Sequence, residues 1–525
     1  ARKPEEALRS SLDRLVESGL MFRSGAPPNA TYRFKHALVQ DAAYGALLRE
    51  PRRALHARIV EALESQSAGE AERQPALLAR HCSEAGLIEK AASLWGKAGE
   101  RSMERFALAE ATEQFTRAVA LVASLPSTPA HRRDEIKLQG ALANALMYAK
   151  GFAAPETRAA EERARLLVEQ VEALGEESPT ELLSIFGGFW AANFARFNGD
   201  ACRDLAAQIL ALAEKQKKSG PLVYGHYLTG FSLAVTGDIA EARAQFDRAI
   251  ELYDPVESGS LGTRQDYRVA SLGYRSLVRW CLGFPEAALA DAERALSDAR
   301  EIGDPLTLMN ALTAVAITHF LRRDYSAAKA VLAELVSLAD DKGAAFWKAT
   351  GVLLRSFVAA MTKEAAGHPQ AIAAAWTAYL STGATLHAPA QRSYLAMAYA
   401  DVGQFDDARQ CIGEAMAAAE NAKERWFEHE VRRIAGEIEL ASPERDMMTA
   451  ERHFLCAFDI ARAQQARSWE LRTATSLARL WRDQDRRREA RDFLAPVYGW
   501  FTEGFDTPDL IEAKALLEEL AIIRK

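Results

Sequence analysis

The stretch LGFPEAAL at residues 282–289, followed by Ala295, shows the pattern that decides the fold of this chain. Gly283 marks a short turn between two helix-forming runs. Small residues allow two helices to approach closely, while a large side chain such as Phe284 fills the space beside them. The stretch therefore predicts two packed helices joined by a tight turn.

The same small–large pattern recurs on both sides of this stretch. It returns at Gly230, Gly237, Ala240, Ala242, Phe246 and Ala249, and again in VGQFDDAR at 402–409 before Ala415. Successive turns at Gly237, Gly283 and Arg323 are 46 and 40 residues apart. The turns at Gly403 and Asp483 then follow at intervals of 80, which is two steps of about 40. The pattern resembles that of tetratricopeptide (TPR) repeats.

One helix pair cannot bury its apolar face alone, so we expect the pairs to stack into a superhelix with a concave groove. The sequence therefore predicts a mainly α fold, with a TPR-like α-solenoid over residues 69–525. We expect roughly ten helix pairs, with weak ones near 131–173 and 345–381.

Residues 1–68 follow a different order and are predicted to form a small winged-helix domain. Apolar residues recur at helical spacing over 4–20. Two short strand-like runs follow at 20–23 and 32–34, joined by the turn-forming sequence GAPPN at 25–29. Helical sequence then resumes, and this order of elements is typical of a winged helix.

Composition places the chain among globular proteins. Hydrophobic residues make up 49% of its 525 residues, and the formal net charge of −7 argues against nucleic acid as a partner of the whole chain. No apolar run approaches the roughly 18 residues that span a membrane. The five cysteines are far apart, as expected for reduced thiols in a cytoplasmic protein. Because the chain begins at Ala1 without a methionine, we expect it to be a piece of a longer protein.

The motifs that carry most enzyme chemistry are missing from the sequence. Gly96-Lys97 is followed by Ala98 and lacks the upstream glycine of a phosphate-binding loop. Neither HExxH nor GxSxG occurs, and the cysteines and histidines lack the spacing of metal ligands. We therefore expect no catalytic residue, no metal site and no cofactor within these 525 residues.

Three longer stretches carry a family resemblance: VYGWFTEGFDTPDL at 497–510, ERWFEHEVRRIAGE at 424–437 and AQQARSWELRTA at 463–474. They resemble the C-terminal arm of a family of bacterial signalling proteins. In that family, helical repeats follow a STAND-type ATPase module, often with a class III adenylate cyclase domain at the front. Small departures are Phe427, Trp469 and Asp485, where the family usually has Tyr, an aliphatic residue and Gly.

The resemblance is strong over 220–521, good over 30–65 and only topological over 70–215. It implies a non-catalytic regulatory arm for signal transduction. The arm would bind an inducer or a protein partner in its superhelix and control an upstream NTPase module, absent from this chain, that binds ATP or ADP.

The segment YRFKHALVQDAAY at 32–44 resembles the winged helix that packs on the nucleotide-binding module of STAND proteins. There a histidine reaches the β-phosphate of ADP, and His36 maps to it. The alternative is that His36 caps the junction between strand and helix. A winged helix can also bind DNA, but residues 1–65 hold eleven Lys/Arg against eight Asp/Glu, a weak basic excess for that role.

Aromatic and polar side chains gather on the expected first helices of neighbouring pairs. The predicted groove residues are Phe189, Trp190, Asn193, His226, Tyr227, Tyr274, Arg275 and Arg279. Aromatics, an amide and arginines on one concave wall suit a small ligand or a peptide. The alternative is that the aromatics fill a wide turn of the superhelix. The long irregular segment 254–266 is either a ligand-contacting loop or a tolerated surface loop.

The tail, about 495–525, is expected to cap the last core layer. Trp500 and Phe501 would cover its open end, and Gly504 would turn the chain. Asp506 or Thr507 would cap the final helix, with Pro508 in its first turn.

Two other functions stay open at this point. One is a DNA-binding transcriptional regulator that uses the winged helix and dimerises through the array. The other is an autonomous TPR scaffold that holds peptides in its groove.

Overall fold

The computed structural model describes residues 4–27, 30–66, 74–151, 154–173, 179–255, 265–364 and 367–522. The fold is mainly α, as predicted, with two short strands among the described residues. The chain divides into two compact units. The first is Ala1–Ala98 with Ala120–Leu125, and the second is Gly99–Val119 with Pro126–Lys525. The predicted domain boundary at residue 68 lies outside the described residues.

The first unit combines a two-stranded ribbon with helices. Its elements are α1 (Glu5–Glu17), β1 (Met21–Ser24), β2 (Thr31–Phe34), α2 (Ala37–Gly45), α3 (Arg49–Gln66), α5 (Pro75–Ala85) and the start of α6 (Ile88–Glu104). The strands pair antiparallel, with Met21 opposite Phe34. The predicted element order is present, and the assignment to the winged-helix fold stays a prediction.

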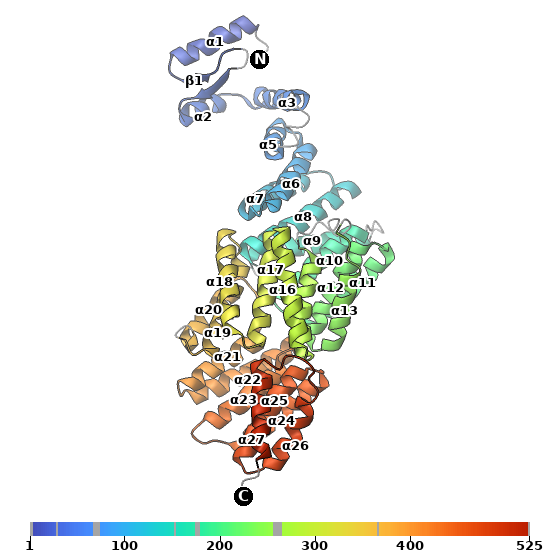
Figure 1. The fold of residues 1–525 in the computed structure, drawn as a ribbon. Helices are drawn as coiled ribbons and strands as arrows, with labels where there is room; N and C mark the ends of the chain where they lie inside the picture. Colours follow the sequence, from blue (N-terminus) through green and yellow to red (C-terminus); the bar gives the residue numbers. More distant parts are fainter. Residues whose placement is uncertain are drawn as a thin grey trace. The chain divides into compact units, whose positions relative to one another are not determined.

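Helix pairs make up the second unit, which continues from α6. Its further helices are α7 (Leu108–Val122), α8 (Pro129–Lys150), α9 (Pro155–Ala173), α10 (Pro179–Ala195), α11 (Gly199–Gln216), α12 (Ser219–Thr236), α13 (Ile239–Glu251), α15 (Tyr267–Cys281), α16 (Pro285–Ile302), α17 (Pro305–Leu321), α18 (Tyr325–Asp341), α19 (Ala345–Met361) and α20 (Pro369–Ser381). The rest are α21 (Ala388–Asp401), α22 (Phe405–Ala422), α23 (Glu428–Ala441), α24 (Met447–Ala463), α25 (Arg467–Asp483), α26 (Arg487–Tyr498) and α27 (Pro508–Ala521). Figure 1 shows many of them as antiparallel neighbours.

The small–large packing predicted from the sequence is present within the pairs. A Cβ atom added to Gly230 on α12 would lie 3.0 Å from the ring of Phe246 on α13. A Cβ on Gly436 of α23 would lie 2.5 Å from the ring of Phe454 on α24. A large buried ring therefore occupies the space that each glycine leaves, as the repeat pattern predicts.

The first helices of six successive pairs form a closed ring. In this ring α12 contacts α15, α15 contacts α17, and α17 contacts α19. Helix α8 contacts both α10 and α19, which closes the ring. The rings of Trp190 on α10 and Phe231 on α12 lie 6.0 Å apart and join the remaining neighbours. One turn of the superhelix therefore ends where it began.

The next turn of the superhelix stands on the first. The backbone N–H groups of Thr385 and Leu386, ahead of α21, donate to the Ala195 carbonyl at the end of α10 over 2.7 and 3.2 Å. Two N–H groups ahead of α23 donate in the same way to Val235, near the end of α12. Ser468 Oγ, in α25, donates to the Trp280 carbonyl over 2.6 Å, across 188 residues of sequence. Carbonyls at three helix ends are thus satisfied by the following turn.

The tail fits the predicted cap in part. Phe501 is buried in the core formed by α24–α27, and Gly504 has the positive φ of +76° expected at a turn. Thr507 precedes Pro508 at the start of α27, but its hydroxyl donates to the Gly504 carbonyl over 2.6 Å. Thr507 therefore occupies the expected N-cap position of the last helix, although its side chain makes no cap hydrogen bond. Trp500 contacts Phe284 between α15 and α16, outside the last core layer.

Candidate binding surfaces

Three of the predicted groove residues come together between the first helices. The ring centroids of Tyr227 and Tyr274 lie 6.2 Å apart, and Tyr274 packs against Phe231 at 4.1 Å. Trp190 Nε1 donates to Ser232 Oγ over 2.9 Å. Trp190 and Tyr227 are only 6% and 7% exposed, and burial raises the pKa of Tyr274.

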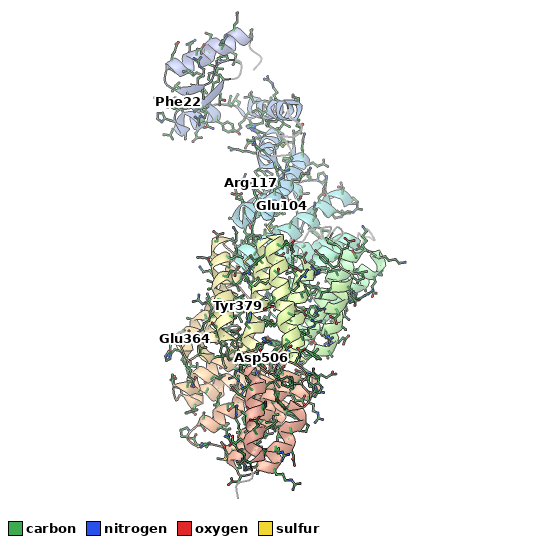
Figure 2. The ribbon with its side chains drawn as sticks, viewed as in Figure 1. Phe22, Glu104, Arg117, Glu364, Tyr379 and Asp506 are labelled. Carbon is green, nitrogen blue, oxygen red and sulfur yellow. The ribbon has the colours of Figure 1, made fainter. Side chains whose placement is uncertain are left out.

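The same core contains side chains from later helices. Phe357 of α19 and Tyr394 of α21 belong to it, as does the buried Tyr379 of α20, labelled in Figure 2. Aromatic side chains thus fill the space beside Trp190 and Tyr227, which is the packing alternative stated for them. A ligand-binding role for these residues stays a prediction.

The other five groove candidates lie apart from this aromatic group. Phe189 is half-buried against a small core that includes Ile136 and Leu167, and Asn193 Nδ2 donates to the Phe189 carbonyl within its own helix. His226 Nδ1 lies 2.8 Å from Gln245 Oε1.

Arg275 and Arg279 form ion pairs between first and second helices. Both guanidinium groups contact the Asp291 carboxylate of α16, at 2.8 and 3.0 Å, and Arg275 also reaches Asp247 of α13 at 2.7 Å. The structure therefore does not bring the eight candidates to one wall.

In the first unit, His36 occupies the N-cap position of α2 with an extended backbone. His36 therefore stands at the junction named by the alternative, although its exposed side chain makes no cap hydrogen bond. Contact between His36 and a phosphate stays a prediction.

A chain of polar side chains that sequence reasoning missed joins α2, α3 and α5. Tyr44 Oη lies 3.0 Å from His56 Nε2 and donates to Glu84 over 3.1 Å. The Nδ1 atoms of His56 and His81 lie 2.8 Å apart, so one ring donates and the other accepts. Burial, and then the charge of His56, lowers the pKa of His81. These residues are up to 40 positions apart, and their spacing matches no sequence motif that would predict the contact.

Apolar side chains remain uncovered in the first unit. Leu38 on α2 is 81% exposed, Leu48 is 77% exposed, and Phe22 on β1 is 55% exposed. All nine residues of α2 are described, and none of them is buried. Figure 2 labels Phe22 on the strand ribbon. A mostly apolar helix with no buried residue leaves apolar side chains in contact with solvent.

The described residues contain neither a metal-site candidate nor a membrane-spanning helix. No three His, Cys, Asp or Glu side chains come together as a possible metal site in those ranges. No helix in that part of the chain is both long and apolar enough to cross a membrane. Of the five free cysteines, four are buried and Cys456 is partly buried. Most of the predicted loop 254–266 lies outside the described residues, since these stop at 255 and resume at 265.

Comparison with known proteins gives distant likenesses. No protein-family model matches the chain. It is 23% identical over 482 residues to the uncharacterized protein R02095 of Rhizobium meliloti (strain 1021), covering 91% of this chain and 46% of that protein. The chain thus spans about half the length of the curated relative that it matches. The resemblance to STAND-type signalling proteins stays a prediction.

Three solved structures share a general likeness. A Rap protein complexed with competence and sporulation factor is 10% identical, with a TM-score of 0.42, and covers 82% of this chain and 99% of its own. The human IFIT1 dimer with m7Gppp-AAAA is 13% identical, with a TM-score of 0.42, covering 82% and 89%. Yeast Tom70 is 13% identical, with a TM-score of 0.33, covering 88% and 96%.

Proposed function

We propose that this chain is a non-catalytic regulatory arm of a larger signalling protein, and that its first unit docks on an NTPase module of the same protein. The observation that carries the proposal is the uncovered apolar surface of that unit. Phe22 lies on β1, Leu38 on α2 and Leu48 just before α3, and all three are more than half exposed.

The physical reason is the free energy that burial of these apolar side chains against a partner would release. Burying a leucine or phenylalanine side chain stabilises a protein by roughly 1.5–3 kcal/mol. Isolated helices as short as α2, which has nine residues, are marginal in water without a packed face. A partner that covers Leu38 and Leu48 therefore stabilises α2 and the ribbon together.

The chemistry of α2 favours a nucleotide-binding partner. His36 presents an exposed imidazole at the start of α2, where free backbone N–H groups and the helix dipole attract anions. A neutral or charged imidazole can donate to a phosphate oxygen. The length of the curated relative is also compatible with a further module.

Regulation would then be a population shift. An inducer or protein partner bound to the second unit would favour one arrangement of the arm on the module, and ATP or ADP in the module would favour another. In the STAND-type family that this chain resembles, the signal is often produced by an adenylate cyclase domain. In this proposal such a domain lies outside this chain.

The first test reads the coding sequence that adjoins this chain. A phosphate-binding-loop module in the same frame is expected, and its absence would contradict the NTPase part of the proposal.

The second test uses the joined protein. Leu38→Glu places a charge in the proposed interface, and we expect the ADP dissociation rate to rise at least about fivefold, equivalent to roughly 1 kcal/mol. Met448→Glu on α24 is the matched control, because Met448 is 85% exposed and lies in the second unit. An equal ADP dissociation rate in both variants would count against docking through α2.

A further inference from the structure

A cavity of about 460 Å³ lies in the second unit, beside the tail. Helix α13 contributes Arg243 and Asp247, and the α15–α16 connection contributes Leu282 and Phe284. Arg467, at the start of α25, and Trp500 complete the wall. The cavity is therefore built from four separate segments of the chain.

The aromatic side of the cavity is held in place by its neighbours. The rings of Trp500 and Phe284 meet edge to face at 5.6 Å. Gly283 has a φ of +91°, and a Cβ atom there would overlap the Trp500 ring, so only glycine leaves room for it.

Three hydrogen bonds to the start of α16 fix the segment that carries Trp500. The Glu503 carboxylate accepts from the N–H groups of Glu286 and Ala287 over 2.9 and 3.0 Å, at the N-terminus of α16. The Gly504 N–H donates in return to Glu286 Oε1 over 2.8 Å. These hydrogen bonds hold the backbone near Trp500 at the cavity, and the Trp500 ring takes no part in them.

Two guanidinium groups face the aromatic side. Arg467 lies 5.4 Å from the centroid of Trp500, and Arg243 lies 5.6 Å from that of Phe284. Arg467 is paired with the buried Glu470 at 2.6 Å. Arg243 Nε lies 3.6 Å from Asp247 Oδ2, an ion-pair distance that is too long for a hydrogen bond, while Asp247 Oδ1 lies 2.7 Å from Arg275. Arg243 is thus oriented by the Phe284 ring and by the charge of Asp247, and its N–H groups donate no hydrogen bond to a described residue.

We infer that this cavity binds a carboxylate that carries an apolar or aromatic group. Arg243 receives the carboxylate through its paired N–H donors, and Leu282, Phe284 and Trp500 cover the apolar group. Such a ligand is either a free organic acid or the C-terminal end of a peptide. As the inducer site of the arm the cavity rests on the proposed function, whereas the binding itself does not.

The test measures binding to this chain alone by isothermal titration calorimetry, so that no module is required. The probes are 4-phenylbutyrate for an organic acid, N-acetyl-leucyl-phenylalanine for a peptide end, and the C-terminal amide of that peptide as the uncharged match. We expect at least one of the two acids to bind, and the amide to bind about tenfold more weakly than the acid peptide if the peptide end is the ligand. Binding by phenylbutyrate alone would identify a free acid.

Arg243→Gln is expected to weaken binding of the acid about tenfold, because Gln keeps a polar group but loses the charge and the paired donors. The control is Arg248→Gln on the same helix, since Arg248 pairs with Glu251 at 3.3 Å and is not part of the cavity wall. Thermal melting of both variants checks that they fold. Absence of binding by both acids at millimolar concentration, or equal affinity in the wild type and Arg243→Gln, would overturn the inference. Neither result would bear on docking through α2.

Discussion

Single residues at the turns decide where helices end. The turns predicted at Gly237, Gly283, Arg323 and Gly403 all contain a residue with positive φ, between +63° and +98°. Asp485, where the resembling family has Gly, has a φ of +61°. Glycine suits Gly237, Gly283 and Gly403 because a Cβ atom costs about 1 kcal/mol in the left-handed region.

The first prediction concerns Asp485. Asp485→Gly is expected to raise the free energy of unfolding by about 0.5–1 kcal/mol, because strain at positive φ is removed. Asp483→Gly, at the last residue of α25, is not expected to raise it, because Asp483 is not at positive φ. Urea unfolding followed by circular dichroism measures both, and changes of the same sign would refute the argument.

A second residue-scale prediction concerns the buried Glu424. Its side chain accepts from the His387 N–H over 3.1 Å and from Trp426 Nε1 over 3.0 Å, while its other oxygen has no partner among the described residues. Burial raises the pKa of this carboxyl from 4.5 to about 8. The folded state therefore holds a proton that the unfolded chain loses near pH 4.5. Stability from this group is complete below pH 4.5 and is lost as the pH rises toward 8.

Glu424→Gln reproduces the protonated carboxyl at every pH. We expect its melting temperature relative to the wild type to increase steadily from pH 5 to pH 8 and then to level off. Glu420→Gln, at an exposed site where the partner Lys423 lowers the carboxyl pKa, is the control and has no such rise. A difference between Glu424→Gln and the wild type that does not change with pH would exclude the proton linkage.

At the scale of helix pairs, the small–large contact is the feature that the sequence pattern encodes. Gly436→Ala is expected to destabilise the protein by about 1–3 kcal/mol, because its Cβ atom would lie 2.5 Å from the fully buried Phe454 ring. Gly413→Ala on α22 is the control, since nothing lies within 4 Å of its added Cβ atom. There, alanine should stabilise the helix by up to about 1 kcal/mol. Thermal melting distinguishes the two signs.

The tail contacts helices that are distant in sequence, in addition to covering the last core layer. Trp500→Ala removes the ring contacts with Phe284 and Arg467 and is expected to lower the melting temperature by several degrees without abolishing the fold. Phe505→Ala is the control, because the Phe505 ring contacts the nearby Tyr498 ring and not a distant helix. An unchanged melting curve for Trp500→Ala would exclude a stabilising role for these contacts.

In the second unit as a whole, contacts between turns change what an α-solenoid usually does. Repeats in an open solenoid contact only their neighbours. Here the N–H groups of Arg425 and Trp426 bond to Val235 over 2.9 and 3.1 Å, and Arg472 bonds to the Leu321 carbonyl. Opening any of these contacts requires two turns of the superhelix to separate, which favours cooperative unfolding of this unit.

Hydrogen exchange provides the last prediction. The amides of Arg425 and Trp426 lie in a connection between helices, yet we expect them to be protected as well as the core helices are, because their bonds join two turns. Amides of α2, which has no buried residue, are expected to exchange fast in this chain alone. Fast exchange at Arg425 and Trp426 would show that the two turns separate readily.

The sequence by itself determined the helix pairs and their turns, because helical spacing, small residues and left-handed turn positions are local properties. The pairs near 131–173 and 345–381, weak in sequence, are formed as α8–α9 and α19–α20. The stretch at 497–510 also predicted a structural role for the tail, although not its contact with Phe284.

Only the tertiary structure decided where the predicted groove residues lie. Trp190, Tyr227 and Tyr274 occupy core positions because the first turn closes between α8 and α19 and the second turn stands on it. Closure depends on small rotations accumulated over many repeats, and no single repeat encodes them. The cavity at Arg243 and Trp500 has the same origin, since its walls meet only after the chain has passed once around the superhelix.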